Sequence, residues 1–147
     1  MIHPELKPGL RFEWTYLIPA RATVPQLYRD TDFCRDMPDV LATGYLVGML
    51  ELACVNGIMP YVDWPREQTV GTYVAFHHLA ATPAGMRLTI KGTLRQVDGR
   101  RLAFHIEAWD EEDKIAEGEH ECMIIVTEKF NARMAQKKAR IADEPRN

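Results

Sequence analysis

Three polar side chains, Thr43, Glu51 and His78, lie in or beside strongly apolar stretches of this sequence. A hydroxyl, a carboxylate and an imidazole are groups that proteins use for acid–base and nucleophilic catalysis. Glu51 is the most informative of them, because an acid inside GYLVGMLELACV is costly to bury without a partner. It therefore predicts a partner or an opening to a site, although an exposed helical stripe or a structural ion pair would explain it equally well.

The adjacent histidines His77 and His78 end an apolar run. Side chains alternate between the two faces of a strand, so only one of these histidines can face a given site. The alternation does not decide which one. A hydrogen-bonded core histidine is the common alternative to a catalytic one, and the same alternative applies to His105 and His120.

Thr43 stands at the start of the apolar helical stretch, where a threonine commonly caps the helix. A hydroxyl in that place also lies beside unpaired N–H groups and the positive end of the helix dipole, which can stabilise an oxyanion or a carbonyl oxygen. The capping role and the functional role can coexist.

Hydrophobic periodicity predicts the elements that position these residues. Residues 11–18 alternate as a strand, and residues 19–40, with three prolines, are typical of a long irregular connection. A very apolar helix is expected from Thr43 to Pro60. An apolar stretch at 69–80 is expected to form a strand, and alternation typical of strands follows at 86–97, 100–109 and 115–126, with a hairpin turn at Asp98-Gly99.

The inward side chains expected for the last three strands are Met86, Leu88, Ile90, Leu94, Leu102, Phe104, Ile106, Ala108, Ala116, Gly118, His120, Cys122, Ile124 and Val126. A single helix that is apolar on nearly every side has to be covered, and the sheet is the simplest cover. The sequence therefore predicts an α+β fold in which an antiparallel sheet wraps around one long central helix.

Two stretches carry more apolar surface than one packing face needs. The strand at 69–80 is apolar on both sides, which predicts burial on both sides. On the helix, Gly44 and Gly48 lie about one turn apart, and Leu52 and Val55 continue their stripe. Such a stripe would let another backbone approach closely. We favour plain packing against the sheet over a helix-dimer motif.

Length and charge restrict the class of protein. The 147 residues fit one domain spanning 1–147, with a basic, fraying tail from about residue 130. A net charge of −3 lacks the basic footprint of a nucleic-acid-binding protein. The segment 40–62 is long enough to span a bilayer, but Glu51 and Asn56 within it favour a buried core helix.

The N-terminal residues and the cysteines indicate the cellular compartment. No basic stretch followed by an apolar one opens the sequence, which predicts a cytoplasmic protein without a signal peptide. Cys34, Cys54 and Cys122 are widely spaced and form no CxxC pair. We therefore expect reduced thiols, no structural disulfide and no metal.

With these residues in place, the chain resembles the hotdog-fold thioesterases, and within them the fluoroacetyl-CoA thioesterase family. The resemblance runs from about Gly9 to Lys138. It rests on the order and spacing of the segments ATGYLVGMLELACV (42–55), GT (71–72), HLAATPAG (78–85), GRRL (99–102), EGEHE (117–121) and EKFNA (128–132). It implies a hotdog fold and a homodimer with active sites at its interface, which could pair further into a tetramer.

The resemblance also implies roles for individual residues. The family's catalytic Thr, Glu and His fall on Thr43, Glu51 and His78, which selects His78 over His77. The family's pocket glycine falls on Gly71, where a bare backbone lets the substrate approach closely. Glu51 would act as a nucleophile through a transient anhydride or as a base for water, and the sequence does not separate these routes.

Two further substrate-binding positions, Met37 and Cys122, depart from the family pattern. The family has an aromatic residue at the first and an arginine at the second. Methionine is a softer lining, and a thiol cannot replace a guanidinium. We therefore expect hydrolysis of a small acyl-coenzyme A without strict fluoroacetyl specificity. No cofactor is expected, since coenzyme A belongs to the substrate. The alternatives are a hotdog acyl-thioester hydratase or dehydratase, and a non-catalytic acyl-CoA-binding module.

Overall fold

A computed structural model describes residues 2–142 and 144–146 of the chain. It contains one five-stranded sheet in the order β1-β3-β4-β5-β2, and every neighbouring pair is antiparallel. The strands are β1 (Arg11–Leu17), β2 (Glu67–His78), β3 (Arg87–Asp98), β4 (Arg101–Trp109) and β5 (Lys114–Val126). The predicted strands and the hairpin turn at Asp98-Gly99 are thus confirmed, and Gly99 has the positive φ of 59° that such a turn requires.

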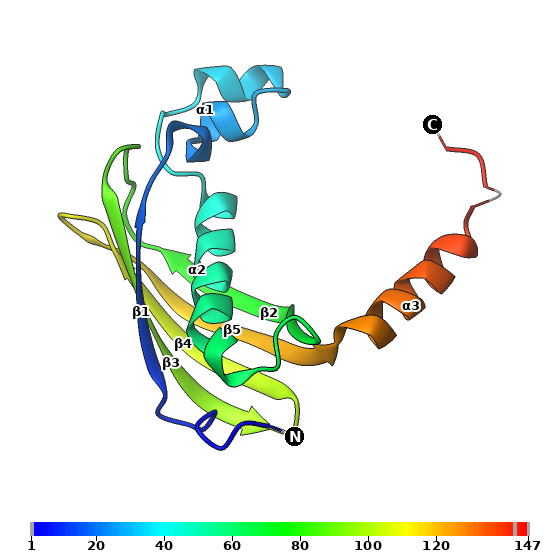
Figure 1. Ribbon diagram of the computed structural model, residues 1–147. Helices are drawn as coiled ribbons and strands as arrows, with labels where there is room; N and C mark the ends of the chain where they lie inside the picture. Colours follow the sequence, from blue (N-terminus) through cyan, green and yellow to red (C-terminus); the bar gives the residue numbers. More distant parts are fainter. Residues whose placement is uncertain (1, 143, 147) are drawn as a thin grey trace.

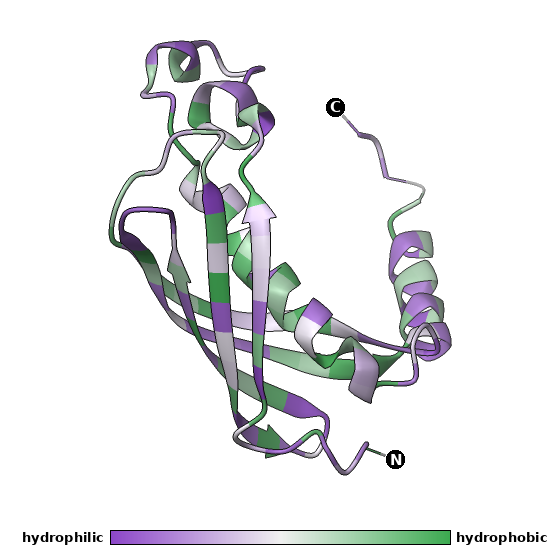
Figure 2. Ribbon diagram, turned by 60° about the vertical axis from the view of Figure 1, so that its left-hand side comes forward, coloured by the Kyte–Doolittle hydropathy of each residue, from purple (hydrophilic) through white to green (hydrophobic). Residues whose placement is uncertain are grey.

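The long helix α2 (Thr43–Ile58) lies across the concave face of the sheet (Figure 1). A short 3-10 turn, η3 (Met59–Tyr61), follows it at Pro60. The sheet-facing side of α2 buries Leu46, Leu50 and Ala53 against the inward residues of the strands. Figure 2 shows the alternation of apolar and polar residues along the strands. Of the fourteen residues predicted to point inward, Met86, Gly118 and Val126 are only half-buried. The others are buried: Leu88, Ile90, Leu94, Leu102, Phe104, Ile106, Ala108, Ala116, His120, Cys122 and Ile124.

The connection between β1 and α2 is less irregular than predicted. It contains the short helices η1 (Ala20–Ala22), α1 (Val24–Leu27) and η2 (Asp32–Asp36), which lie beyond the N-terminal end of α2 (Figure 1). Backbone bonds tie its end to the body, with Leu41 N–H donating to the Thr82 carbonyl at 2.7 Å. This connection therefore holds the first turn of α2 in place.

Strand β2 is an edge strand, and the prediction that it is buried on both sides is wrong for a single chain. Residues 71–75 are exposed, including Tyr73 at 50% and Val74 at 46%. The apolar run identified the strand, but it did not show that β2 is the last strand of the sheet and has no neighbour at its second edge in this chain. An apolar edge of this kind offers unpaired backbone groups to another strand.

The stripe of Gly44, Gly48 and Leu52 on α2 also faces away from the sheet. Both glycines are exposed, and Leu52 is 47% exposed. The interpretation that this stripe packs plainly against the sheet is therefore wrong, because the opposite side of α2 makes that contact. The exposed stripe and the exposed edge of β2 leave apolar surface on the same chain without a cover.

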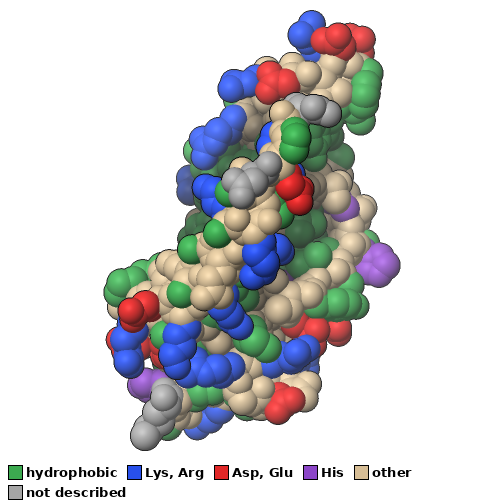
Figure 3. Space-filling model, turned by 90° about the vertical axis from the view of Figure 1, so that its right-hand side faces the viewer, with side chains coloured by type: hydrophobic (Ala, Val, Ile, Leu, Met, Phe, Trp, Pro, Cys, Tyr) green, Lys and Arg blue, Asp and Glu red, His purple; other side chains and the backbone are tan. Residues whose placement is uncertain are grey.

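The last helix, α3 (Thr127–Ala139), extends away from the sheet after β5 (Figure 1). Residues 131–139 are all exposed, and several Lys and Arg side chains gather over this part of the surface (Figure 3). The basic tail predicted from about residue 130 is thus helical at first. Residues 143 and 147 of that tail lie outside the described part of the chain. In the described residues, every helix is too short or too polar to cross a membrane.

Candidate active site

A hydrogen bond joins the start of α2 to the end of β2. Oγ1 of Thr43 and Nδ1 of His78 are 2.8 Å apart. Thr43 is the first residue of the helix, and His78 is the last residue of the strand. The N-cap position belongs to Ala42. The structure therefore does not support the capping alternative for Thr43, because its hydroxyl contacts the imidazole instead.

The second ring nitrogen of His78, Nε2, is a buried atom, and no group of the described residues hydrogen-bonds to it. An open pocket beside the ring is lined by Thr43, His78, Leu79, Ala80 and Ala81. The first N–H groups of a helix have no acceptor within the helix and carry the positive end of its dipole. A hydroxyl, an imidazole and a helix N-terminus therefore meet at one pocket, while the neighbouring His77 is exposed.

Glu51 lies in the middle of α2 and is half-buried, with its carboxylate against β2 at Gly71. A Cβ atom on Gly71 would lie 2.9 Å from Oε1 of Glu51 and 3.3 Å from Cε1 of His120. Both distances are shorter than ordinary van der Waals contact, so the absence of a side chain at Gly71 makes room for the carboxylate.

A β-bulge lies next to this glycine. Gly71 pairs with Cys122 and Tyr73 pairs with Glu121, which leaves Thr72 as the extra residue of β2. Bulges bend a strand locally, re-aim its side chains and recur beside active sites. The bulge thus shapes the backbone directly beneath the Glu51 carboxylate.

Cys122 and Cys54 lie close enough to Glu51 to be affected by its charge. Both cysteines are buried free thiols. Burial raises the pKa of the Cys122 thiol to about 12, and the negative charge of Glu51 adds to that rise. Burial also raises the pKa of Cys54, with smaller contributions from Cys122 and Glu51. These thiols are therefore neutral at physiological pH and bring no positive charge to the carboxylate.

His120 is the inward-facing histidine of β5 and is 1% exposed. Its Nδ1 lies 3.0 Å from the backbone carbonyl of Tyr73 in the bulge. Burial lowers the pKa of His120, while the Tyr73 bond and the charges of Glu51 and Glu121 partly oppose that effect. Alternation predicted that this side chain points inward, and the structure adds that it lies near Glu51 and bonds the carbonyl in the bulge.

Within one chain, the Thr43–His78 pair and Glu51 are two separate groups. Glu51 follows Thr43 by eight positions on the same helix, a rise of about 12 Å along the helix axis. On β2, His78 is the neighbour of Thr43 and Gly71 is the neighbour of Glu51, and these two residues are seven positions apart. The structure therefore brings Thr43 to His78 and Glu51 to Gly71 and Cys122, but it does not bring all three predicted catalytic residues together in a single chain.

An apolar groove runs along the exposed side of α2. It is lined by Leu27, Tyr28, Gly44, Tyr45, Gly48, Met49 and Leu52. Its ends adjoin Thr43 and Glu51, the chain neighbours of Gly44 and Leu52. Met37, predicted to line the substrate pocket, is 43% exposed at the end of η2, and it lines neither this groove nor the pocket beside His78.

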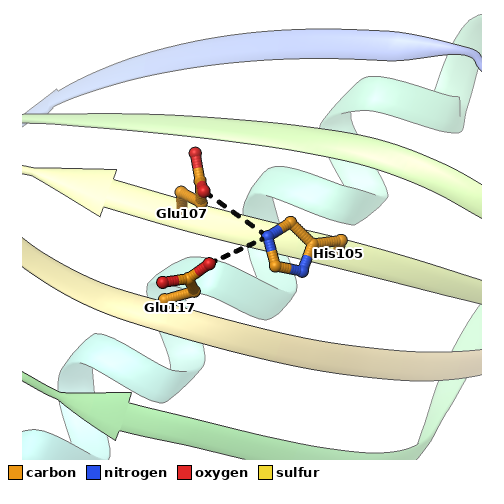
Figure 4. Close-up of side chains that lie close together, drawn as sticks. All are labelled: His105, Glu107 and Glu117. Carbon is orange, nitrogen blue, oxygen red and sulfur yellow. Dashed lines mark ion pairs between the residues drawn. The ribbon is translucent and has the colours of Figure 1, made fainter.

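One cluster in the described residues has the side chains of a metal site. The ligand atoms of His105, Glu107 and Glu117 lie within 4.8 Å of one another. They stand on the face of the sheet opposite to α2, which is visible behind the strands in Figure 4. The ammonium group of Lys114 already bonds both carboxylates, at 2.9 Å to Glu117 and 3.2 Å to Glu107. These side chains form a network of ion pairs on the outer face of the sheet, remote from Thr43 and Glu51.

Comparison with known proteins places this site in a family. Residues 27–128 match the family of fluoroacetyl-CoA-specific thioesterases. A fluoroacetyl-CoA thioesterase from Streptantibioticus cattleyicolor is 41% identical over 132 residues, which cover 90% of this chain and 94% of that protein.

Solved structures agree with this match. The structure of the fluoroacetyl-CoA thioesterase FlK has a TM-score of 0.85 at 41% identity and covers 89% of this chain and 96% of its own. A hot-dog-like protein from Thermanaerovibrio acidaminovorans shares the fold, with a TM-score of 0.74 at 18% identity and coverage of 90% and 94%. The predicted α+β hotdog fold is thus confirmed, and the chain belongs to the fluoroacetyl-CoA-specific thioesterase family.

Proposed function

We propose that this protein hydrolyses the thioester of a small acyl-coenzyme A, with Thr43, Glu51 and His78 as its catalytic residues. The observation that carries the proposal is the 2.8 Å contact between the Thr43 hydroxyl and His78 Nδ1, which leaves the buried Nε2 of His78 without a partner among the described residues. Family membership supports the reaction type, since the matched relative is a thioesterase.

In this proposal the reaction uses three groups with distinct tasks. Thr43, with the N–H groups at the start of α2, holds the thioester carbonyl oxygen as negative charge develops on it. Glu51 takes a proton from water while the water oxygen bonds to the acyl carbon, or attacks that carbon itself to form an anhydride that water then cleaves. The C–S bond breaks, and His78 gives its Nε2 proton to the departing thiolate. The proton that water loses on either route returns to His78 through solvent, so both groups are restored when the acid and the thiol leave.

The separation of Glu51 from the Thr43–His78 pair within one chain supports a dimer with shared sites. The exposed edge of β2 at residues 71–75 has room for the same strand of a second copy. A twofold antiparallel pairing near Val74 exchanges the ends of the two strands. It lays His78 of one copy near Gly71 of the other, and so brings the Thr43–His78 pair of one chain to Glu51 of its partner. Two such dimers could pair further into a tetramer.

The substrate range follows from what surrounds the carboxylate. Cys122 is buried beside Glu51 and is neutral, so it offers no guanidinium to a polar acyl group. The groove along Gly44 and Gly48 is lined by apolar and aromatic side chains. This lining favours unsubstituted short acyl groups and their longer homologues over strict recognition of fluorine. Coenzyme A enters as part of the substrate, and the proposed chemistry uses no cofactor.

The test is thiol release from acetyl-, fluoroacetyl-, longer-chain and aromatic acyl-CoA esters. Wild-type protein is compared with Glu51→Gln, which keeps the size of the side chain and removes its basicity. We expect turnover by the wild type and a fall of about 100- to 10,000-fold in the variant, the usual contribution of a general base. Glu107→Gln, on the opposite face of the sheet, is the matched control and keeps wild-type turnover.

The same assay separates hydrolysis from the alternatives, which the matched relatives do not favour. A hydratase would consume the conjugated double bond of an enoyl thioester without releasing thiol. A binding module would hold the intact ester for hours without turnover. Either outcome would contradict the proposed function.

A further inference from the structure

His120 is a buried histidine that the proposed reaction does not use. It is one of three buried polar side chains among the described residues, with Thr23 and Thr82. The ring of Phe104 on β4 stacks on it, with the ring centroids 6.2 Å apart and the planes 19° from parallel. On the side of β2, its Nδ1 contacts the Tyr73 carbonyl. The imidazole is thus held on one face and at one nitrogen.

The Tyr73 contact fixes the tautomer of the ring. A carbonyl oxygen can only accept a hydrogen bond, so Nδ1 of His120 must carry the proton and donate it. Burial lowers the pKa of His120 and keeps the ring neutral near neutral pH, which leaves Nε2 with a lone pair. Near Glu51, therefore, the ring is a fixed and uncharged group.

The same ring reaches the place where the Glu51 carboxylate lies. Cε1 of His120 and Oε1 of Glu51 are 3.3 Å and 2.9 Å from one common point above Gly71. That point is next to the bulge between Gly71 and Tyr73. The ring of His120 hydrogen-bonds to the carbonyl of Tyr73 in that bulge. His120 therefore contacts the bulge through Nδ1 and borders the carboxylate with the adjoining edge of the ring.

We propose that His120 is a positioning residue for Glu51. By donating to the Tyr73 carbonyl, it fixes the bulge of β2, and with it the bare backbone at Gly71 over which the carboxylate must lie. The ring edge forms one wall of the space that Glu51 occupies. This inference rests on the proposed function, because it assigns the held carboxylate to catalysis.

The chemistry of the surrounding groups agrees with such a role. The charges that act on His120 are those of Glu51 on α2 and Glu121 on β5. Glu51 is the one whose carboxylate, like the His120 ring, lies within 3.3 Å of the point above Gly71. Phe104 of β4 brings only an aromatic face.

Two substitutions separate positioning from simple packing. In His120→Asn, the amide nitrogen stands where Nδ1 stood and can still donate to Tyr73. In His120→Leu, the volume is similar but the donor is lost. We expect His120→Leu to lower kcat by up to about 100-fold, the cost of a catalytic group misplaced by about 1 Å. KM changes little, and His120→Asn recovers most of kcat. His105→Asn, on the outer face, is the control and keeps wild-type kinetics.

A kcat of His120→Leu equal to that of the wild type, with Glu51→Gln inactive, would overturn the inference and leave the proposed function intact. Equal losses of kcat in His120→Leu and His120→Asn would also overturn it. A loss of stability in both variants without a change in kcat would reduce His120 to a packing residue.

A second measurement does not need turnover. Long-range ¹H–¹⁵N spectra of the full protein report the tautomer and the pKa of His120. We expect a proton on Nδ1, and a further fall of the pKa in Glu51→Gln, because the negative charge that raises it is gone. Glu107→Gln leaves that pKa unchanged. A pKa that does not respond to Glu51→Gln would overturn the placement of Glu51 beside His120, even if the wild type released no thiol.

Discussion

The hydroxyl of Thr43 lies 2.8 Å from Nδ1 of His78, so the first residue of α2 and the last residue of β2 form one hydrogen-bonded pair. The pair fixes the imidazole plane and leaves Nε2 buried, with no bonding partner among the described residues. A buried polar nitrogen of this kind is costly unless a ligand or another chain satisfies it. The hydroxyl of Thr43 therefore serves His78, and the N-cap position is held by Ala42.

Replacing the Thr43 hydroxyl tests this pair. Thr43→Val keeps the shape and removes the hydroxyl, while Thr43→Ser keeps the hydroxyl. Removal of one oxyanion-stabilising donor typically lowers kcat by about 100- to 1,000-fold. We expect such a fall in Thr43→Val and a much smaller one in Thr43→Ser, measured as thiol release. Because Ala42 is the N-cap, thermal unfolding of the two variants stays near that of the wild type.

Gly71→Ala tests the space for the Glu51 carboxylate. The added methyl group would lie 2.9 Å from Oε1, and this flexible side-chain end can move aside without unfolding the strand. We expect the carboxylate to be displaced, with a loss of kcat approaching about 100-fold and little change in the urea midpoint of unfolding. Gly48→Ala, where an added Cβ meets nothing within 4 Å, is the control for the effect of a glycine-to-alanine change on the urea midpoint. An active Gly71→Ala variant would show that the carboxylate works from elsewhere.

Much of the fold could be predicted from the sequence, and the parts that could not have identifiable physical reasons. Strands β3, β4 and β5 each have one buried side, so period-two alternation predicted residues such as Leu94, Phe104 and Ile124 as buried. Strand β2 is apolar on both sides, and the pattern cannot tell a neighbouring strand of the same chain from one of a second chain. The exposure of Val74 therefore came only from the structure.

The candidate site, like the fold, could be predicted from the sequence only in part. Thr43, Glu51 and His78 were found as polar groups in apolar surroundings, and the family resemblance gave their roles. Their distribution over two places in one chain could not be predicted, because it depends on the register of β2 against α2. The inward side of His120 was predicted, but its bond to the Tyr73 carbonyl involves the bulge at Thr72, which inserts one residue into β2 without any signal in the alternation.

Subunit complementation tests the shared site. Glu51→Gln and His78→Ala are each expected to be inactive, because each damages both sites of a dimer. When the two proteins are unfolded, mixed and refolded together, a mixed dimer combines the intact Glu51 of one chain with the intact His78 of the other. We expect thiol release to return in the mixture but not in either protein refolded alone. No recovery, with mixed dimers present by native mass spectrometry, would place the complete site within one chain.

The two thiols near Glu51 give a test of burial at the site. Burial raises the pKa of Cys122 to about 12, and it also raises the pKa of Cys54. The thiolate is the reactive form, so both cysteines are almost fully unreactive at neutral pH. We expect alkylation by iodoacetamide to be slow in the folded protein and fast in urea, followed by peptide mass spectrometry. Rapid labelling of Cys122 in the folded state would mean that the surroundings of Glu51 are open to solvent.

The lowered pKa of His120 makes the stability of the fold depend on pH in a definite direction. In the unfolded chain a histidine titrates near pH 6.5, whereas burial holds the folded-state pKa of His120 lower. Above about pH 6.5 both states are neutral and the stability is complete; as the pH falls, the unfolded chain takes up the proton first, and the free energy of unfolding decreases. His120→Asn cannot take up that proton. We therefore expect the urea midpoint of the wild type to fall more than that of His120→Asn between about pH 7.5 and about pH 5.5, since the other titrating groups act on both proteins alike. Equal decreases would mean that His120 titrates in the folded protein as it does in the unfolded chain, which would contradict its burial beside Glu51.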